Sequence, residues 1–161
     1  MHITGGKLRR RAIKIVDKNG VRPTSAKVRE AIFSMIGHDL NGVSFLDSFG
    51  GSGIMGLEAW SRGASPVLIT EKNSRSVQQI RRHVQAFEAS ISVERIDAAK
   101  GIIGDWDAIF LDPPYRMDVH PYLRQALEVA SWIVIAETAV ESPPNLSIVQ
   151  SVMDKKGWSV W

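Results

Sequence analysis

The chain has 161 residues, 44% of them hydrophobic and 23% charged, which is typical of a single globular domain with a buried core. It contains no cysteine, which excludes disulfides and thiolate metal sites and fits a reducing, cytoplasmic compartment. No segment approaches the roughly 18 apolar residues of a membrane span, and no apolar segment follows the basic N-terminus as in a secretory signal. We therefore expect a soluble cytoplasmic protein that has no membrane partner.

The net charge of +3 is distributed unevenly along the chain. Residues 1–30 hold nine basic and two acidic residues, a net charge of +7, so the remaining residues carry −4. A basic segment on a mildly acidic body favours a polyanionic partner, because phosphate contacts dominate the affinity of proteins for nucleic acids. A solvated basic surface without a partner is the alternative.

The first 22 residues mix basic and apolar side chains between two turn signals, Gly5-Gly6 and Asn19-Gly20. This pattern predicts a short β-hairpin or extended strands. A helix is predicted to follow over residues 23–36, because apolar residues recur there at helical spacing. We expect residues 1–22 to form a basic arm and residues 23–161 to form the main domain.

Strands and helices then alternate along the chain. Strands are predicted at residues 43–46, 67–70, 92–96, 108–111 and 132–136, helices at 54–62, 74–89 and 121–130, and a terminal hairpin at 147–153 and 158–161. Apolar strands that alternate with helices are typical of a mostly parallel sheet with helices on both faces. The sequence therefore predicts an α/β fold.

A glycine-rich turn, Ser48-Phe49-Gly50-Gly51-Ser52-Gly53, follows the first of these strands. Ligands of open α/β sheets bind beyond the carboxyl ends of the strands, which is where this turn is expected. Gly51, Gly53 and Gly56 also match the dinucleotide fingerprint, and Glu71 follows the second strand, where a carboxylate can accept both hydroxyls of a ribose. Two cofactors therefore compete, NAD and S-adenosylmethionine.

Acidic residues at the ends of three successive strands favour S-adenosylmethionine. Asp47, directly before the turn, suits a cationic ammonium group and would repel a pyrophosphate. Asp97, after the third strand, adds an acceptor where an adenine amino group could lie. Any one of these acids could instead be a loop carboxylate or a helix cap, and Phe49 could be a core aromatic. The residues that we expect to contact the cofactor are Asp47, Phe49, Gly51, Ser52, Gly53, Glu71, Asp97 and Ala98.

The tetrapeptide Asp112-Pro113-Pro114-Tyr115 follows the apolar strand 108–111. The prolines stiffen the backbone and have no N–H, so nearby carbonyls are free to accept hydrogen bonds. The Asp112 carboxylate is a further acceptor, and the Tyr115 ring offers a face for stacking. We expect these residues to hold a flat ring by its amino group, in position to attack an electrophile. An ordinary turn after a strand is the alternative.

Several segments, taken in order over almost the whole chain, resemble the RsmD family, bacterial methyltransferases of a guanine N2 amine in 16S ribosomal RNA. They are Gly5-Gly6-Lys7, Arg22-Pro23-Thr24, Val28-Arg29-Glu30-Ala31-Ile32-Phe33, the glycine-rich turn and Asp112-Pro113-Pro114-Tyr115. The resemblance implies a Rossmann-like, seven-strand, class I methyltransferase fold that uses S-adenosylmethionine. It also implies that residues 112–115 hold the target base. The chain departs from the family in its short 97–106 connection and in its early end, which would trim the last strand.

The resemblance further implies that the basic arm contacts ribosomal RNA, free or within the assembled small subunit. The residues expected to bind the RNA are Lys7, Arg9, Arg10, Arg11 and Arg22. The protein is expected to act as a monomer. No metal is expected, since the four histidines show no metal-ligand spacing.

Other functions and roles stay open from the residues alone. Asp112-Pro113-Pro114-Tyr115 would also suit an adenine-N6 methyltransferase of DNA or RNA, or a protein-amide methyltransferase. The glycine pattern would suit an NAD-dependent oxidoreductase, and the arm alone would suit a non-catalytic RNA-binding module. Arg29 could face substrate or cofactor, or form an exposed salt bridge, and Glu137 could face the cleft.

Overall fold

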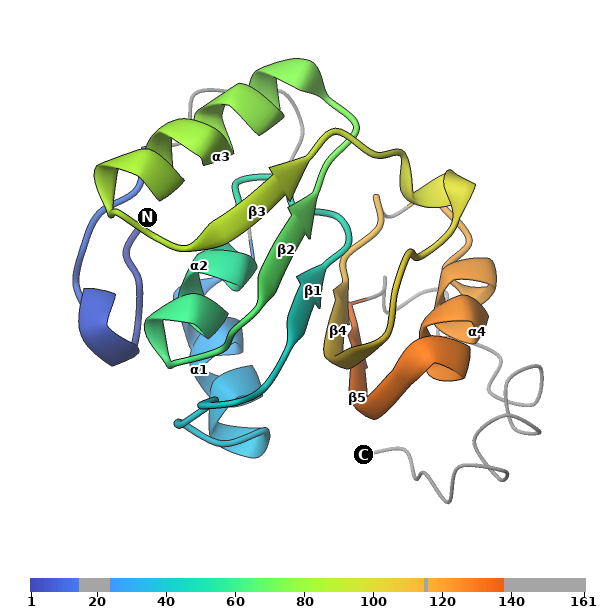
Figure 1. Cartoon of the computed structure of the whole chain (residues 1–161), viewed down its shortest axis with the longest axis horizontal. Helices are drawn as coiled ribbons and strands as arrows, with labels where there is room; N and C mark the ends of the chain where they lie inside the picture. The colour runs from blue at the N-terminus through green and yellow to red at the C-terminus, as the bar shows by residue number, and fades with distance from the viewer. Residues whose placement is uncertain (15–23, 115, 138–161) are drawn as a thin grey trace.

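A five-stranded parallel sheet forms the centre of the protein, whose computed structural model describes residues 1–14, 24–114 and 116–137 (Figure 1). The strands are β1 (Phe45–Asp47), β2 (Val67–Thr70), β3 (Ile91–Glu94), β4 (Trp106–Leu111) and β5 (Ala130–Ala136). Their order is β3-β2-β1-β4-β5, and every neighbouring pair is parallel. The chain order reverses between β1 and β4, and open α/β sheets bind ligands at such a point.

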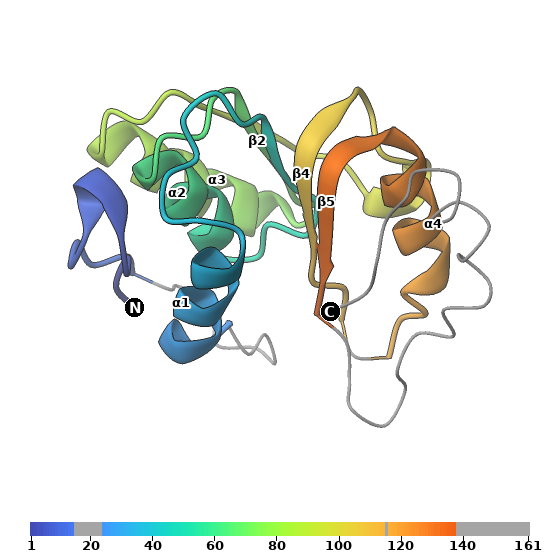
Figure 2. The ribbon, with the colours of Figure 1, turned by 90° about the horizontal axis from the view of Figure 1, so that it is seen from below.

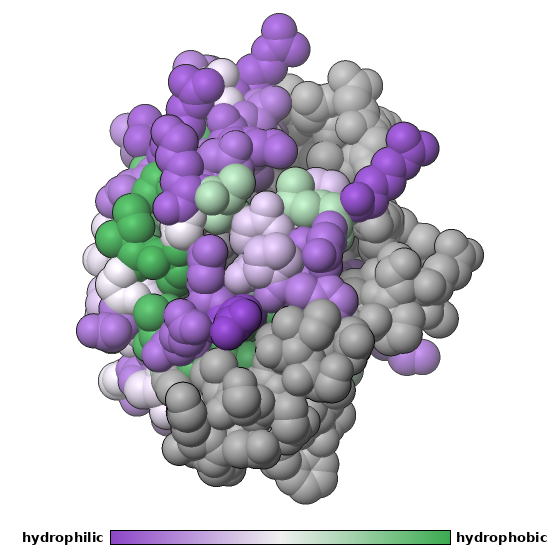
Figure 3. Space-filling model, turned by 90° about the vertical axis from the view of Figure 1, so that its right-hand side faces the viewer, coloured by the Kyte–Doolittle hydropathy of each residue, from purple (hydrophilic) through white to green (hydrophobic). Residues whose placement is uncertain are grey.

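Four α-helices cover the two faces of the sheet. The helices are α1 (Ala26–Met35), α2 (Ile54–Ser61), α3 (Ser74–Ala86) and α4 (His120–Val129), with short 3-10 helices η1 (Gly6–Leu8) and η2 (Ala98–Lys100). In Figure 2, α1, α2 and α3 lie on one side of β4 and β5, and α4 lies on the other. The described surface on the side of β5 and α4 is mostly hydrophilic (Figure 3). None of the described helices is long and apolar enough to cross a membrane.

The predicted helices and internal strands are confirmed, and their ends differ by a few residues. The first strand begins at Phe45, two residues later than predicted, because the Ser44 amide donates to the Asp107 carboxylate (2.9 Å) and not to a backbone carbonyl of a neighbouring strand. The third helix ends at Ala86, ahead of Glu88, whose φ of 51° is incompatible with a helix. The terminal hairpin predicted at 147–161 lies outside the described residues, so five of seven expected strands are described.

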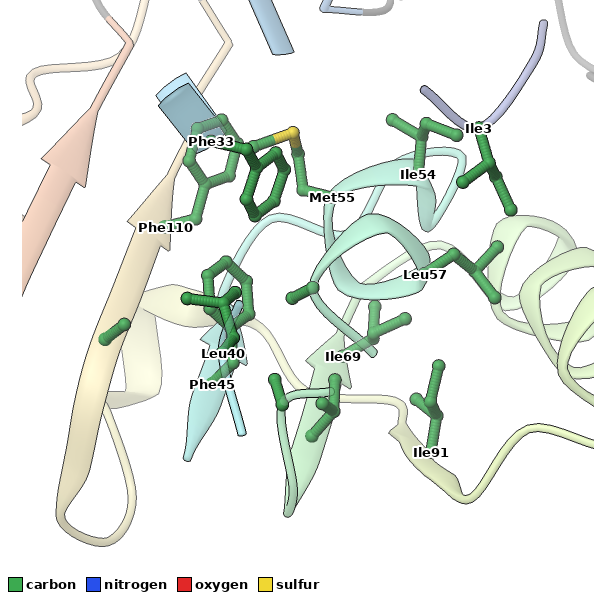
Figure 4. Close-up of a cluster of buried hydrophobic side chains, with 14 of the residues drawn as sticks. Ile3, Phe33, Leu40, Phe45, Ile54, Met55, Leu57, Ile69, Ile91 and Phe110 are labelled. Atoms are coloured by element: carbon green, nitrogen blue, oxygen red, sulfur yellow. The ribbon is translucent and has the colours of Figure 1, made fainter. Parts of the chain in front are cut away.

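Buried side chains on the α1–α3 face form the larger of two hydrophobic clusters. In Figure 4, Phe33 of α1, Met55 of α2 and Phe110 of β4 lie together. Ile3 lies beside Leu57 of α2 in the same view, and it is fully buried although it belongs to the N-terminal arm. Burial of this kind contributes roughly 1.5–3 kcal/mol for each large aliphatic side chain, so Ile3 and the equally buried Ile13 anchor residues 1–14 to the core.

The described part of the arm is a loop with η1 at its tip. Its two limbs run antiparallel and meet at a single bridge between His2 and Ala12, with further hydrogen bonds such as Ile3 N to Arg11 O (3.0 Å). Residues 1–14 contain no strand, so the predicted β-hairpin is not confirmed as a pair of strands. The remainder of the arm, residues 15–22, lies outside the described residues.

A buried ion pair joins the arm to α1 and α2. The Glu58 carboxylate accepts from Arg29 Nε (3.1 Å), from the Thr4 amide (2.7 Å) and from the Arg62 guanidinium. Arg29 also donates to the carbonyls of Thr24 (2.5 Å) and His2 (2.7 Å), and its side chain is fully buried. Arg29 is therefore shielded from solvent, and its described donors are used within the protein. It is a structural cross-link between segments that are distant in the sequence.

Replacing Arg29 by methionine is expected to lower the free energy of unfolding by roughly 3–5 kcal/mol, because the substitution leaves the buried Glu58 carboxylate short of a partner. Urea denaturation followed by circular dichroism measures this loss. The matched control is Arg124→Met, since Arg124 pairs with Glu128 at 3.9 Å on α4 but is 57% exposed. A control variant as destabilised as Arg29→Met would contradict the assignment.

Candidate functional site

Three carboxylates lie at the carboxyl edge of the sheet. Asp47 ends β1, Glu71 follows β2 and Asp112 follows β4. Because β1 pairs in parallel with both β2 and β4, these three residues leave the same edge side by side. The charges of Asp112 and Glu71 both act on Asp47 and raise its pKa, which places the three groups within electrostatic reach of one another.

The glycine-rich turn is tied to this edge by backbone hydrogen bonds. Gly50 N donates to Thr70 O (2.8 Å), and Gly51 N donates to Glu71 Oε2 (2.9 Å). Gly53 has a φ of 77°, and a Cβ there would lie 2.9 Å from the Ile80 side chain, so glycine is required both by the backbone and by the space. The turn therefore brings main-chain atoms close to the edge and starts α2 there.

Glu71 links the glycine-rich turn to the start of α3. Its Oε2 accepts from Gly51 N, and its Oε1 accepts from Asn73 N (2.7 Å). A carboxylate oxygen has two lone pairs, so each oxygen can still accept a hydroxyl proton from a ligand. The side chain is half-buried, and its orientation is fixed by these two amides.

Asp47 is the most buried of the three acids, with 1% of its surface exposed. Its Oδ2 accepts from Gly56 N (3.1 Å) in the first turn of α2, whereas Oδ1 has no hydrogen-bond partner among the described residues. Burial raises the pKa of Asp47 to about 7, the Gly56 hydrogen bond opposes this rise, and the neighbouring acids add to it. A buried acceptor without a donor is costly to keep, and a cationic donor would satisfy it.

Asp112 is half-buried beyond β4. Burial is the main cause that raises its pKa to about 7, the charge of Glu137 adds to the rise, and a hydrogen bond with the Thr24 side chain lowers it. Pro113 is buried and Pro114 is exposed. The Pro114 carbonyl accepts from Met117 N (2.7 Å), while the Pro113 carbonyl accepts no hydrogen bond among the described residues. Tyr115 lies outside the described residues.

The remaining predicted cofactor residues lie around the same end of the sheet. Asp97 is half-buried and caps η2, since its Oδ1 accepts from Ala99 N (3.1 Å), and Ala98 is buried. Phe49 is half-buried, and its ring meets the Tyr122 ring edge-on at a centroid distance of 5.2 Å. Ser52 is half-buried in the glycine-rich turn. Their contact with a cofactor stays a prediction.

The basic residues of the arm fall into two groups. Lys7 lies over the Trp60 ring at 3.4 Å, and Arg11 lies 5.5 Å from the centre of the Phe87 ring, so both are held by cation–π contacts. Arg9 and Arg10 are exposed and line a groove of about 770 Å³ between the arm and the start of α1. Thr24 also lines this groove. Arg22 lies outside the described residues.

Thr24 and Glu137 join this site in the structure, and the sequence assigned no role to Thr24. The Thr24 hydroxyl donates to Glu137 Oε2 (3.2 Å) and also reaches Asp112. Glu137 N donates to Leu111 O (2.8 Å), so Glu137 lies next to the residue that follows β4. The sequence signal for Glu137 was its place directly after an apolar strand. Thr24 had none beyond its place in the Arg22-Pro23-Thr24 segment that resembles the family.

Comparisons with known proteins show that the chain is similar to methyltransferases. The family described as conserved hypothetical protein 95 matches residues 1–156. The ribosomal RNA small subunit methyltransferase D of Escherichia coli is 28% identical, over 92% of this chain and 82% of its own length. The "Putative rRNA methyltransferase YlbH" of Bacillus subtilis is 34% identical, over 72% of this chain and 67% of its own. The solved structure "Putative methyltransferase yhhF from Escherichia coli" covers 89% of this chain and 83% of its own, with 26% identity and a TM-score of 0.77.

Asp47→Asn is expected to stabilise the protein at high pH. The folded-state pKa of about 7 lies above the unfolded value near 3.9, so keeping Asp47 costs stability above pH 7, and this cost disappears as the pH falls toward 4. Thermal or urea unfolding should show that the substitution raises the free energy of unfolding by roughly 1–3 kcal/mol more at pH 8 than at pH 4.

Asp107→Asn provides a control of opposite sign. Hydrogen bonds from Ser131 and Ser44 lower the pKa of Asp107, so its contribution to stability is present above pH 4 and is lost as the pH falls further. The Asp107 substitution should therefore destabilise the protein at pH 8. An Asp47 substitution that destabilises the protein equally at both pH values would contradict the burial of an unpaired charge.

Proposed function

The chain belongs to the conserved hypothetical protein 95 family, and from this membership and the site we propose that it methylates the exocyclic N2 amine of a guanine in small-subunit (16S) ribosomal RNA, with S-adenosylmethionine as the methyl donor. Two matched relatives are named as ribosomal RNA methyltransferases, and one name specifies the small subunit. One observation carries the proposal. The buried, unpaired Asp47 Oδ1 lies at the same sheet edge as Asp112 and its two prolines.

The residues at this edge fit the proposed cofactor. When bound, S-adenosylmethionine supplies an electrophilic methyl group on a positively charged sulfur. Asp47 would hold its ammonium group, Glu71 would hold the ribose hydroxyls, and Asp97 with Ala98 would lie beside the adenine. The glycine-rich turn, including Phe49, Gly51, Ser52 and Gly53, would line the remaining surface. NAD fits less well, because Asp47 and Asp112 would repel its pyrophosphate.

Asp112 and the Pro113 carbonyl provide two acceptors for the hydrogens of the target amine. Holding both hydrogens directs the nitrogen lone pair toward the methyl group, and such orientation can lower the barrier by roughly 7–11 kcal/mol. Pro114 stiffens this turn, and Tyr115 would stack on the base. A base inside a helix cannot reach such a turn, so the target guanine would be splayed out or unpaired.

The arm would guide the RNA toward this turn. Arg9 and Arg10 line a groove that also contains Thr24, and Thr24 contacts the Asp112 side of the site. Lys7, Arg11 and Arg22 would extend the basic surface. On this proposal residues 1–22 are the RNA-contacting arm and residues 23–161 the catalytic domain. The protein would act as a cytoplasmic monomer.

Transfer of a labelled methyl group tests the proposed function. The protein is incubated with labelled S-adenosylmethionine and unmethylated small-subunit ribosomal RNA. The RNA is supplied either free or in assembled subunits, and its nucleosides are then analysed. The expected product is N2-methylguanine. Label in adenine would overturn the assignment of the base. If the protein binds the cofactor but transfers no label to the RNA in either form, the proposed reaction is wrong.

Asp112→Ala is expected to reduce methyl transfer by about a hundredfold or more, because the amine loses an acceptor that orients it. Cofactor affinity should change by less than about threefold, since Asp112 faces the base. Asp112→Asn keeps an acceptor oxygen but does not titrate. The rate of methyl transfer by the wild type should therefore decrease as the pH drops below about 7, where Asp112 becomes protonated. The rate of the Asn variant should not show this decrease.

Steady-state rates between pH 5.5 and 8.5 and cofactor titrations at pH 8 measure both effects. Equal losses of transfer and cofactor binding in Asp112→Ala would indicate damage to the fold. A wild-type pH profile that Asp112→Asn leaves unchanged would show that another group titrates.

Arg9→Gln and Arg10→Gln are each expected to weaken RNA binding about equally for all sequences. The slope of the logarithm of the affinity against the logarithm of the salt concentration should fall by about 0.7–0.9 for each phosphate that the variant no longer binds. The change in slope is measured by filter binding of ribosomal RNA at roughly 50 to 300 mM salt, the range where such slopes are resolved. Arg124→Gln on α4 is the matched control and should leave the slope unaltered.

A further inference from the structure

Two carboxylates lie side by side where β4 and β5 end. β4 and β5 are parallel neighbours, and Leu111 pairs with Ala136 in their register. The next residue on each strand is acidic, Asp112 on one and Glu137 on the other. Glu137 N donates to Leu111 O (2.8 Å), so the parallel pairing continues to the position at which both side chains leave the sheet.

Thr24 connects these two carboxylates from a third segment of the chain. Its hydroxyl donates to Glu137 Oε2 (3.2 Å), and it lies near enough to Asp112 to lower the pKa of that carboxyl. Its own carbonyl accepts from Arg29 Nη1 (2.5 Å), and Arg29 is fixed by the buried pair with Glu58. The backbone of Thr24 is therefore fixed by Arg29, while its side chain faces the two acids. Thr24 is a positioning residue for these carboxylates.

The three side chains form a surface that is rich in acceptors and poor in donors. The two carboxylates have four oxygens, and the Thr24 hydroxyl has a single proton to offer them. Within the described ranges, no lysine, arginine or histidine forms an ion pair with Asp112 or Glu137. Burial and the charge of Glu137 raise the pKa of Asp112, as expected for two acids that lack a common cation. A ligand that presents adjacent N–H donors would satisfy this surface.

Asp47 gives an independent indication that a donor-bearing ligand belongs at this edge. Its side chain is 1% exposed, its Oδ1 has no partner among the described residues, and the charge of Asp112 acts on it. In the strand order β1-β4-β5, Asp112 lies between Asp47 and Glu137. Asp47 is therefore nearer to the proposed cofactor position, and Glu137 is farther from it. The base would therefore meet Asp112 and Glu137 together.

Guanine and adenine differ in what they offer to such a pair. Guanine presents N1–H and the N2 amine next to each other, so its edge is a row of donors. Adenine presents its N6 amine next to N1, which is an acceptor. Against two carboxylates, the N1 lone pair of adenine would face a carboxylate oxygen with no proton between them, which is unfavourable at close range.

We propose that Glu137 is a specificity-determining residue that accepts the N1–H of the target guanine while Asp112 accepts from its N2 amine. This inference rests on the proposed function and adds the means by which guanine is chosen over adenine. Thr24 positions Glu137 through its hydroxyl and lies beside Asp112. Arg29 acts on the base only through Thr24.

The base 2-aminopurine keeps the exocyclic amine at position 2 but lacks both the N1–H and the O6 of guanine. Comparison with Glu137→Gln separates the two losses, because only the interaction at N1 depends on Glu137. Small subunits are reconstituted with ligated ribosomal RNA that carries guanine or 2-aminopurine at the nucleotide methylated by the wild-type enzyme. Single-turnover methyl transfer is then measured for the wild type, for Glu137→Gln and for Glu128→Gln. Glu128 is an exposed glutamate near the end of α4 and serves as the matched control.

The wild type and Glu128→Gln should prefer guanine over 2-aminopurine on the order of a hundredfold, since a site built to bind an N–H group rejects an analogue that lacks it. Glu137→Gln should reduce this preference to less than about tenfold, because its amide can either accept from or donate to N1. Thermal melting of each variant shows whether it is folded.

Three results would overturn the inference. Equal rates of the wild type on the two bases would exclude an interaction with N1–H, whatever the variant does. A guanine preference that Glu137→Gln leaves at the wild-type value would assign the interaction to another group. Absence of methyl transfer by the wild type to any guanine would overturn the proposed function itself, and the inference with it.

Discussion

The buried contact between Arg29 and Glu58 is the interaction on which the described structure depends. Glu58 lies on α2, the helix that follows the glycine-rich turn, and Arg29 lies on α1. Through Thr4, His2 and Thr24 the pair also holds the arm and the segment before α1. Charges removed from water stabilise a fold only when every polar atom finds a partner, and here the donors come from segments far apart in the sequence. The arm, the turn and Thr24 are consequently fixed relative to one another.

The carboxyl edge of the sheet has the opposite electrostatic character. Asp47, Glu71 and Asp112 are close together. Burial and the charges of Asp112 and Glu71 raise the pKa of Asp47 to about 7, and burial and the charge of Glu137 raise the pKa of Asp112 to about 7. Such an arrangement costs folding free energy, which a protein tolerates at a site where a ligand supplies the missing donors and positive charge. The protein thus combines a fully paired ion pair between α1 and α2 with an under-paired edge of the sheet, and the first helps to hold the second in place.

Local patterns in the sequence predicted much of the fold and the grouping of acidic residues at the carboxyl edge of the sheet. The strand 67–70 was predicted at its observed bounds, because an apolar run between turn signals needs no distant information. The three acids share an edge because parallel strands impose it. The burial of Arg29 and the contact of Thr24 with Glu137 could not be predicted in the same way. They join residues 29 and 113 positions apart, and only the packed structure brings them together.

Calorimetric titration with S-adenosylmethionine, in buffers of different ionisation enthalpy, tests most directly whether the acidic edge binds a cationic cofactor. Near pH 7, Asp47 is about half protonated in the free protein, so a bound ammonium group should release up to about half a proton from it. Release should vanish at pH 9 and be reduced in Asp47→Asn. Proton uptake on binding, as an anionic ligand would cause, or no binding by the folded protein, would contradict the assignment of this edge.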